Sequence, residues 1–129
     1  MNENYIRIYQ NAVPDEFCDK MIKQFEDNPE QYHYQKRANP NRNFKMSFNQ
    51  IHISNEKNWK EEDKYLMNMF PKYVDRYREE CDVIESQWPL EWGYEPIRFK
   101  RYLPNGNEFF SSHVDVTSYK TANRFLVFF

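Results

Sequence analysis

The sequence predicts an α+β domain in which the helices come before most of the strands. Two segments with apolar residues at helical spacing lie in the first two thirds of the 129 residues. Alternating apolar segments separated by turn signals fill the last third. Aromatic residues make up 19% of the chain, so it can build a core although only 40% of its residues are hydrophobic. This order favours helices that buttress an antiparallel sheet, and the length suits one domain.

The first third of the chain predicts a strand, a helix and a loop. Residues 5–9 alternate between polar and apolar types, as a short strand does. Pro14 and the two acids after it mark the start of a helix, which Asn28 and the proline after it should end. Residues 30–42 are polar and bordered by prolines, which indicates a surface loop.

The remaining elements follow from the same patterns. Residues 44–54 alternate, as one strand or a tight pair does, and apolar residues at helical spacing follow over 59–84, where Pro71 should kink or split the helix. Further strands are expected at 97–102, 108–117 and 124–129, with a strong turn signal at 104–107. The run 125–129 is wholly apolar, as in a strand with a neighbour on each side.

Composition excludes several classes of function. The net charge of −2 gives no reason to expect a nucleic acid, and two glycines are too few for a Gly-rich phosphate loop. No apolar run is long enough to span a membrane, and no signal peptide is visible. Cys18 and Cys81 fall on the apolar faces of expected helices, which predicts buried thiols in a reducing, cytoplasmic setting.

The best candidates for chemistry are His113 and Asp115. In a strand, residues i and i+2 share one face, about 6.6–6.8 Å apart, so an imidazole and a carboxylate could lean onto one metal ion. Such ligands suit a two-His, one-carboxylate site for non-haem Fe(II), and Val114 and Val116 would then face a core. Alternatively, His113 and Asp115 simply pair on an exposed strand face, since so short a motif also arises by chance.

Residues 98–129, RFKRYLPNGNEFFSSHVDVTSYKTANRFLVFF, resemble the prolyl 4-hydroxylase-like branch of the Fe(II)- and 2-oxoglutarate-dependent dioxygenases. The shared pattern is a strand ending in Tyr, a Gly-containing turn, an aromatic residue, the motif His-x-Asp, a short loop and an Arg-led apolar strand. The segment VPDEFCDKMIKQFE is similar to the opening helix of that family. The resemblance implies N-terminal helices packed on an incomplete double-stranded β-helix, a cupin-like jelly roll.

The resemblance also implies roles for individual residues. His113 and Asp115 match the first two iron ligands, and Tyr102 matches a strand tyrosine that lines the 2-oxoglutarate pocket. Arg124 matches a residue at the start of the next strand, where its role is structural. The implied cofactors are Fe(II), the cosubstrate 2-oxoglutarate and O₂, with ascorbate as an optional reductant. The implied reaction hydroxylates a C–H bond of a peptide or small-molecule substrate.

Two parts of the family's site have no match in this sequence. These are a distal His on a late strand and an Arg or Lys that grips the far carboxylate of 2-oxoglutarate. His52 is expected to be solvated or hydrogen-bonded rather than to replace the missing ligand. We therefore expect residues 1–129 to be the N-terminal portion of a dioxygenase domain that is inactive without its remainder or a partner chain. The alternative is a non-catalytic module that pairs its open sheet edge with another chain.

Overall fold

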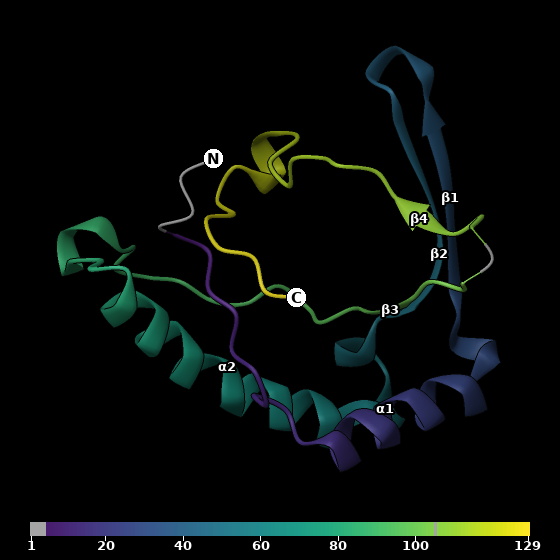
Figure 1. Cartoon of the computed structure of the whole chain (residues 1–129), viewed down its shortest axis with the longest axis horizontal. Helices are drawn as coiled ribbons and strands as arrows, with labels where there is room; N and C mark the ends of the chain where they lie inside the picture. Colours follow the sequence, from purple (N-terminus) through teal and green to yellow (C-terminus); the bar gives the residue numbers. More distant parts are fainter. Residues whose placement is uncertain (1–4, 105) are drawn as a thin grey trace. The chain divides into compact units, whose positions relative to one another are not determined.

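The computed structural model describes residues 5–104 and 106–129, and these residues form an α+β structure (Figure 1). It contains two α-helices and a four-stranded antiparallel open sheet, which confirms the expected fold class at that level. The chain divides into two compact units. We call them the helical unit, which runs up to Tyr32 and includes Ile51–Phe99, and the sheet unit, which comprises His33–Gln50 and Lys100–Phe129.

The helical unit is built on α1 (Asp15–Asp27) and α2 (Lys60–Glu80). The helix α1 begins after Pro14 with two acids in its first turn, as the sequence predicts. The helix α2 is longer, and it continues through Pro71 without being split. The predicted split at Pro71 is therefore wrong, because tertiary packing can offset the hydrogen bond that proline removes, while the alternative of a kink stays a prediction.

The core of the helical unit is formed by aromatic and branched side chains. Ile51, Ile53 and Trp59 are completely buried there, and the Trp59 indole N–H donates a hydrogen bond of 2.9 Å to Gln31 Oε1. The other members of this core are Met21 and Phe25, with Phe17, Tyr32, Leu66, Ile97 and Phe99 packed against it. The high aromatic content of the sequence thus supplies the buried area that the chain needs.

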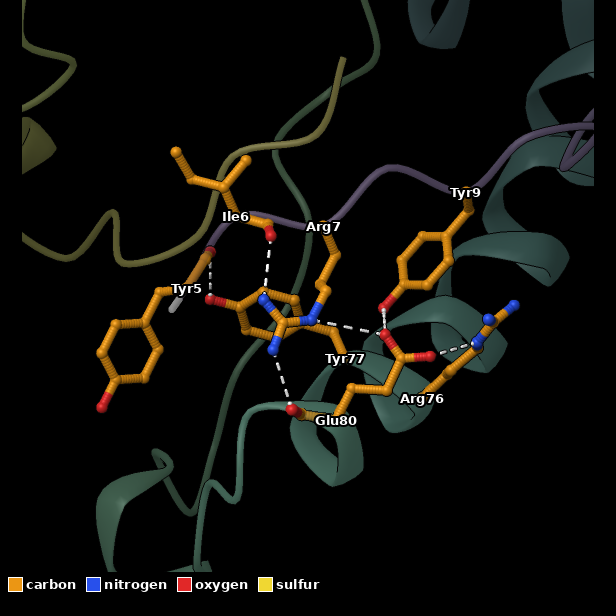
Figure 2. A network of polar contacts seen from close by, with 7 residues as sticks. All are labelled: Tyr5, Ile6, Arg7, Tyr9, Arg76, Tyr77 and Glu80. Atoms are coloured by element: carbon orange, nitrogen blue, oxygen red, sulfur yellow. Dashed lines mark hydrogen bonds and ion pairs between the residues drawn. The ribbon is translucent and has the colours of Figure 1, made fainter. Parts of the chain in front are cut away.

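The N-terminal segment before α1 lies along the end of α2, although it is not the strand that its alternation predicts (Figure 2). Glu80 is the centre of this contact. It accepts hydrogen bonds from Arg76 at 2.6 Å and Tyr9 at 3.2 Å, and Arg7 Nε lies 3.5 Å from the same carboxylate. The Tyr77 hydroxyl donates to the Tyr5 carbonyl at 2.8 Å. Side-chain hydrogen bonds therefore hold this segment, instead of a strand ladder.

The sheet has β2 (Phe44–Ile51) as its central strand, with β1 (His33–Asn39) on one side. The short strands β3 (Phe99–Arg101) and β4 (Phe109–Phe110) both pair with β2 on the other side. The expected loop at 30–42 is thus wrong, since most of it forms β1. None of the residues of β1 is buried, so it lacks the apolar alternation by which strands are recognised.

The C-terminal part of the chain contains less strand than expected. Only Phe109 and Phe110 of the predicted strand 108–117 are extended in a ladder, and residues 124–129 belong to no strand of the described structure. The turn expected at 104–107 is seen at Pro104, Gly106 and Asn107, while residue 105 lies outside the described residues. High β propensity alone does not make a strand, because a strand needs a partner with which to pair.

Several smaller features complete the description. Cys18 is exposed and Cys81 is partly exposed, so the prediction that both thiols are buried is wrong. The described helices include none with the length and apolar character that crossing a membrane requires. Short 3-10 turns occupy Pro29–Gln31, Pro40–Arg42, Ile53–Asn55, Lys57–Trp59, Glu85–Gln87 and Tyr119–Thr121.

Candidate metal centre

The strand β4 anchors the segment that carries the candidate ligands. Phe110 lies opposite Met46 of β2, and the Ser111 N–H then donates a hydrogen bond of 2.9 Å to the Lys45 carbonyl. The Lys45 N–H in turn donates to the Ser111 hydroxyl oxygen at 3.0 Å. Two hydrogen bonds thus fix Ser111 to the central strand, two residues before His113.

The His113 ring is held by packing and by one hydrogen bond. It stacks on the Phe110 ring, with centroids 3.9 Å apart and planes inclined by 15°, and the Phe44 ring meets it edge-on at 6.3 Å. His113 Nδ1 lies 2.7 Å from the Ser111 carbonyl oxygen. Because a carbonyl can only accept, Nδ1 donates this hydrogen bond, and in the tautomer with that proton the Nε2 lone pair can bind a metal ion.

His113 Nε2 lies 3.4 Å from Asp115 Oδ1, and both side chains are about one third exposed. Residues 113–115 are not part of a strand, so the expected strand geometry is wrong, and a bend brings the two side chains together instead. Val114 and Val116 are 69% and 45% exposed, which contradicts the prediction that they face a core. The two side chains nevertheless lie close together, as both a shared metal ion and a simple exposed pair require.

The spacing of these two atoms fits a shared metal ion. Ligand bonds of about 2.1 Å from nitrogen and oxygen can span up to about 4.2 Å, so one cation can reach both atoms. A separation of 3.4 Å is longer than the roughly 2.7–2.9 Å of a charge-assisted N–H···O bond. A histidine whose other nitrogen donates to a backbone carbonyl is also the usual arrangement of a metal-bound imidazole.

Arg124 supports the loop that contains Asp115. Its Nη1 donates a hydrogen bond of 2.9 Å to the Asp115 backbone carbonyl, from a position nine residues later in the chain. The guanidinium therefore acts on the backbone of the candidate ligand and leaves the carboxylate group itself available. The strand that the resemblance implies at Arg124 is not formed, since residues 124–129 belong to no strand of the described structure.

Tyr102 is connected to His113 through a series of aromatic contacts. Its ring lies 5.0 Å from that of Phe48, which lies 5.3 Å from Phe110, the ring on which His113 stacks. Phe48 is buried, whereas Tyr102 is 42% exposed. Partial burial raises the pKa of the Tyr102 hydroxyl, so this group remains a hydrogen-bond donor at neutral pH.

Lys100 is a member of the same cluster that the sequence interpretation missed. Its ammonium lies 4.9 Å from the centre of the Phe110 ring and 5.3 Å from that of Phe48, both within cation–π range. It comes two residues before Tyr102, and this spacing places both side chains on one face of an extended segment. The same spacing could have indicated Lys100 as a candidate from the sequence.

The described residues contain no group of three His, Cys, Asp or Glu side chains arranged to hold a metal ion. His33 is the exposed first residue of β1, and His52 belongs to the helical unit and is partly buried. The structure thus brings His113 and Asp115 together but adds no third ligand to them within the described part of the chain.

In comparisons with known proteins, no protein-family model, curated protein or solved structure matches the chain.

Proposed function

We propose that the sheet unit carries two ligands of an Fe(II) centre of the 2-oxoglutarate-dependent dioxygenase type. The observation that carries the proposal is the pair formed by His113 and Asp115. Nδ1 of the imidazole is fixed on a backbone carbonyl, and Nε2 lies 3.4 Å from a carboxylate oxygen. The open antiparallel sheet would then be part of a double-stranded β-helix, and the third ligand would have to be supplied from outside the described residues.

In this proposal, the residues around His113 and Asp115 have distinct roles. Phe110 holds the imidazole plane by stacking, and Arg124 holds the backbone of Asp115. Tyr102 would donate a hydrogen bond to a bound 2-oxo acid, and the Lys100 ammonium would attract its far carboxylate. Bound iron and 2-oxoglutarate would supply the oxidising chemistry for hydroxylating a C–H bond, while the protein positions the substrate and excludes water.

The proposal can be tested by metal titration of the purified chain. Co(II) replaces Fe(II) because it resists oxidation by air, and its visible absorption reports coordination by nitrogen and oxygen. We expect weak binding by the 129-residue chain, since it offers two protein ligands, and no release of succinate from 2-oxoglutarate. Added imidazole should tighten Co(II) binding by supplying the missing third nitrogen.

Matched variants make this test specific. His113→Ala and Asp115→Ala should abolish the Co(II) signal, whereas His33→Ala and Asp75→Ala, which change exposed residues elsewhere, should preserve it. Lys100→Gln and Tyr102→Phe should leave Co(II) binding intact but weaken the effect of 2-oxoglutarate on it. Equal Co(II) affinities in all four alanine variants would show that the pair at 113 and 115 is not a metal site.

A second candidate function is a binding or assembly module that pairs with another chain. The observation in its favour is the apolar segment 125–129, where Phe125 and Val127 are each 48% exposed. Exposed apolar segments without charge promote strand addition and aggregation. Val127→Lys with Phe129→Lys should therefore raise solubility. A sharp monomer peak of the unmodified chain in size-exclusion chromatography would favour this binding module over the incomplete dioxygenase domain.

A further inference from the structure

The overall charge of −2 hides a separation of charge between the two units. The sheet unit contains eight Lys and Arg against two acids, Glu108 and Asp115, which gives a net charge of +6. The rest of the chain contains ten basic and eighteen acidic residues, a net charge of −8. The net charge gave no reason to expect a nucleic acid because it is a total that averages a basic unit with an acidic one.

The β1–β2 hairpin contains half of these basic residues and no acidic one. Its four cations are Lys36, Arg37, Arg42 and Lys45, and all four are exposed. Within the described part of the chain, none of these side chains forms an ion pair. Their charges therefore point into solvent without a partner, a state that favours an anionic ligand.

Strand register places part of this charge beside aromatic residues. Lys36 lies opposite Ser47, and Ser47 lies opposite Phe109, so these three residues form a row across β1, β2 and β4. Tyr34 is two residues from Lys36 and its hydroxyl hydrogen-bonds to Ser47 at 3.0 Å. Lys45 is two residues from Ser47 on the same side. We call this set of Tyr34, Lys36, Lys45, Ser47 and Phe109 the Ser47 face.

The Ser47 face is the reverse side of the sheet from the candidate metal centre. Phe48 and Phe110, which contact each other and lead to His113, occupy the alternate positions of β2 and β4. On the Ser47 face, the Tyr34 side chain is 57% exposed and Phe109 is 39% exposed. Two aromatic rings are thus accessible on the same face as Lys36 and Lys45, where a ligand with both planar and anionic groups could contact them together.

We propose that the Ser47 face binds single-stranded nucleic acid. The lysines would contact phosphates, while Tyr34 and Phe109 would each stack on a base, as aromatic residues do on sheets that bind single strands. An acidic polypeptide could also pair with the lysines, but its carboxylate side chains do not stack on Tyr34 and Phe109, whereas every nucleotide carries both a phosphate and a planar base, so the observations favour nucleic acid. This inference stands on charge and register and does not depend on the proposed metal centre.

The test is binding of a fluorescein-labelled oligothymidylate of about 12 nucleotides, within the site size of single-strand binding surfaces. Fluorescence anisotropy is measured with the complete 129-residue chain in EDTA, so that metal plays no part. Replacing Lys36 and Lys45 by Gln should weaken binding roughly 25-fold at 0.1 M salt and lower the salt slope by about 1.4. Tyr34→Ala should weaken binding by roughly 5- to 150-fold.

Two control variants distinguish binding at the Ser47 face from a general effect of charge and from a loss of folding. Lys57→Gln with Lys60→Gln makes the same change of charge on exposed residues of the helical unit, and it should leave the affinity unchanged. Lys36→Arg with Lys45→Arg keeps the charge and should retain binding. Equal losses in the Lys57 and Lys60 variant, or no loss in Tyr34→Ala, would overturn the proposal. Displacement of the oligonucleotide by polyglutamate at equal charge concentration would also overturn it, because the face would then fit an acidic protein.

Discussion

Arg124 and Asp115 are joined by a hydrogen bond of 2.9 Å from the guanidinium of the first to the backbone carbonyl of the second. The contact joins two residues nine positions apart, just after the candidate ligands, in a part of the chain without regular strand structure. The orientation of the Asp115 carboxylate therefore depends on a side chain that does not itself approach the metal position.

Arg124→Ala should weaken Co(II) binding while leaving both candidate ligands in the sequence. The loss is expected because the Asp115 backbone would sample other orientations before binding, and outer contacts of this kind typically contribute about 10- to 100-fold in metal affinity. Arg124→Lys should recover part of the affinity by donating to the same carbonyl. Titration at constant ionic strength measures both variants. An unchanged affinity in Arg124→Ala would show that the loop is fixed by other contacts.

Phe110→Ala should affect stability and metal affinity together. Phe110 is partly buried and contacts the Phe48 and His113 rings, so its removal should lower the free energy of unfolding by roughly 1–3 kcal/mol. Phe110→Leu keeps most of the volume and should lose less stability but still weaken Co(II) binding, because the stack under the imidazole is gone. Urea denaturation and Co(II) titration separate the two effects. Full Co(II) affinity in Phe110→Leu would exclude a positioning role for the ring.

Glu80 predicts a stability that depends on pH. The hydrogen bond from Arg76 is the main cause that lowers the pKa of Glu80, and Tyr9 and Arg7 add to it. Because the folded pKa lies below the unfolded one, the ionised carboxylate stabilises the fold above pH 4.5. That contribution declines as the pH falls through the folded pKa.

Glu80→Gln provides the measurement for this effect. The variant should be less stable than the parent near pH 7, and the difference should shrink as the pH falls below 4.5. Urea denaturation at several pH values gives the difference directly. A difference that stays constant from pH 7 to pH 3 would mean that the charge of Glu80 does not stabilise the contact between the N-terminal segment and α2.

Lys20 should be more important for stability than other exposed lysines. Its ammonium lies 2.7 Å from Glu62 Oε1, and Glu62 is buried with 2% exposure. Lys20→Met would leave that buried carboxylate without its cation, which is costly in a poorly solvated site. Lys23→Met, which breaks the exposed ion pair with Asp27, is the matched control and should have little effect. Equal thermal midpoints in the two variants would contradict this prediction.

The sequence predicts those elements whose apolar pattern is buried in the structure. The helix α1 and the central strand β2 lie where periodicity places them, because Phe25 and Phe48 face a core. The sequence pattern does not predict β1, because its side chains are mostly exposed and do not alternate between apolar and polar. These residues form a strand because their backbone pairs with that of β2. Patterns of single residues cannot show that kind of pairing.

The candidate site was also predictable only in part. The pairing of His113 and Asp115 follows from their closeness in sequence, although a bend rather than a strand produces it. Tyr102 and Lys100 reach the same cluster only through Phe48 and Phe110, which are more than fifty residues apart in the chain. Such a contact depends on strand register, which the sequence alone did not indicate.

The register of β4, the two-residue strand, determines on which side of the sheet the candidate metal centre lies. Side chains alternate between the two sides along a strand. A shift of β4 by one residue would therefore exchange the sides on which Phe109 and Phe110 lie, and it would turn the His113 loop toward Lys36 and Lys45. Two residues of ladder, the paired hydrogen bonds between Ser111 and Lys45, and the contact of Phe110 with Phe48 oppose that shift. A single inserted or deleted residue just before Phe109 could therefore move the candidate metal centre onto the opposite surface of the sheet without altering any of its side chains.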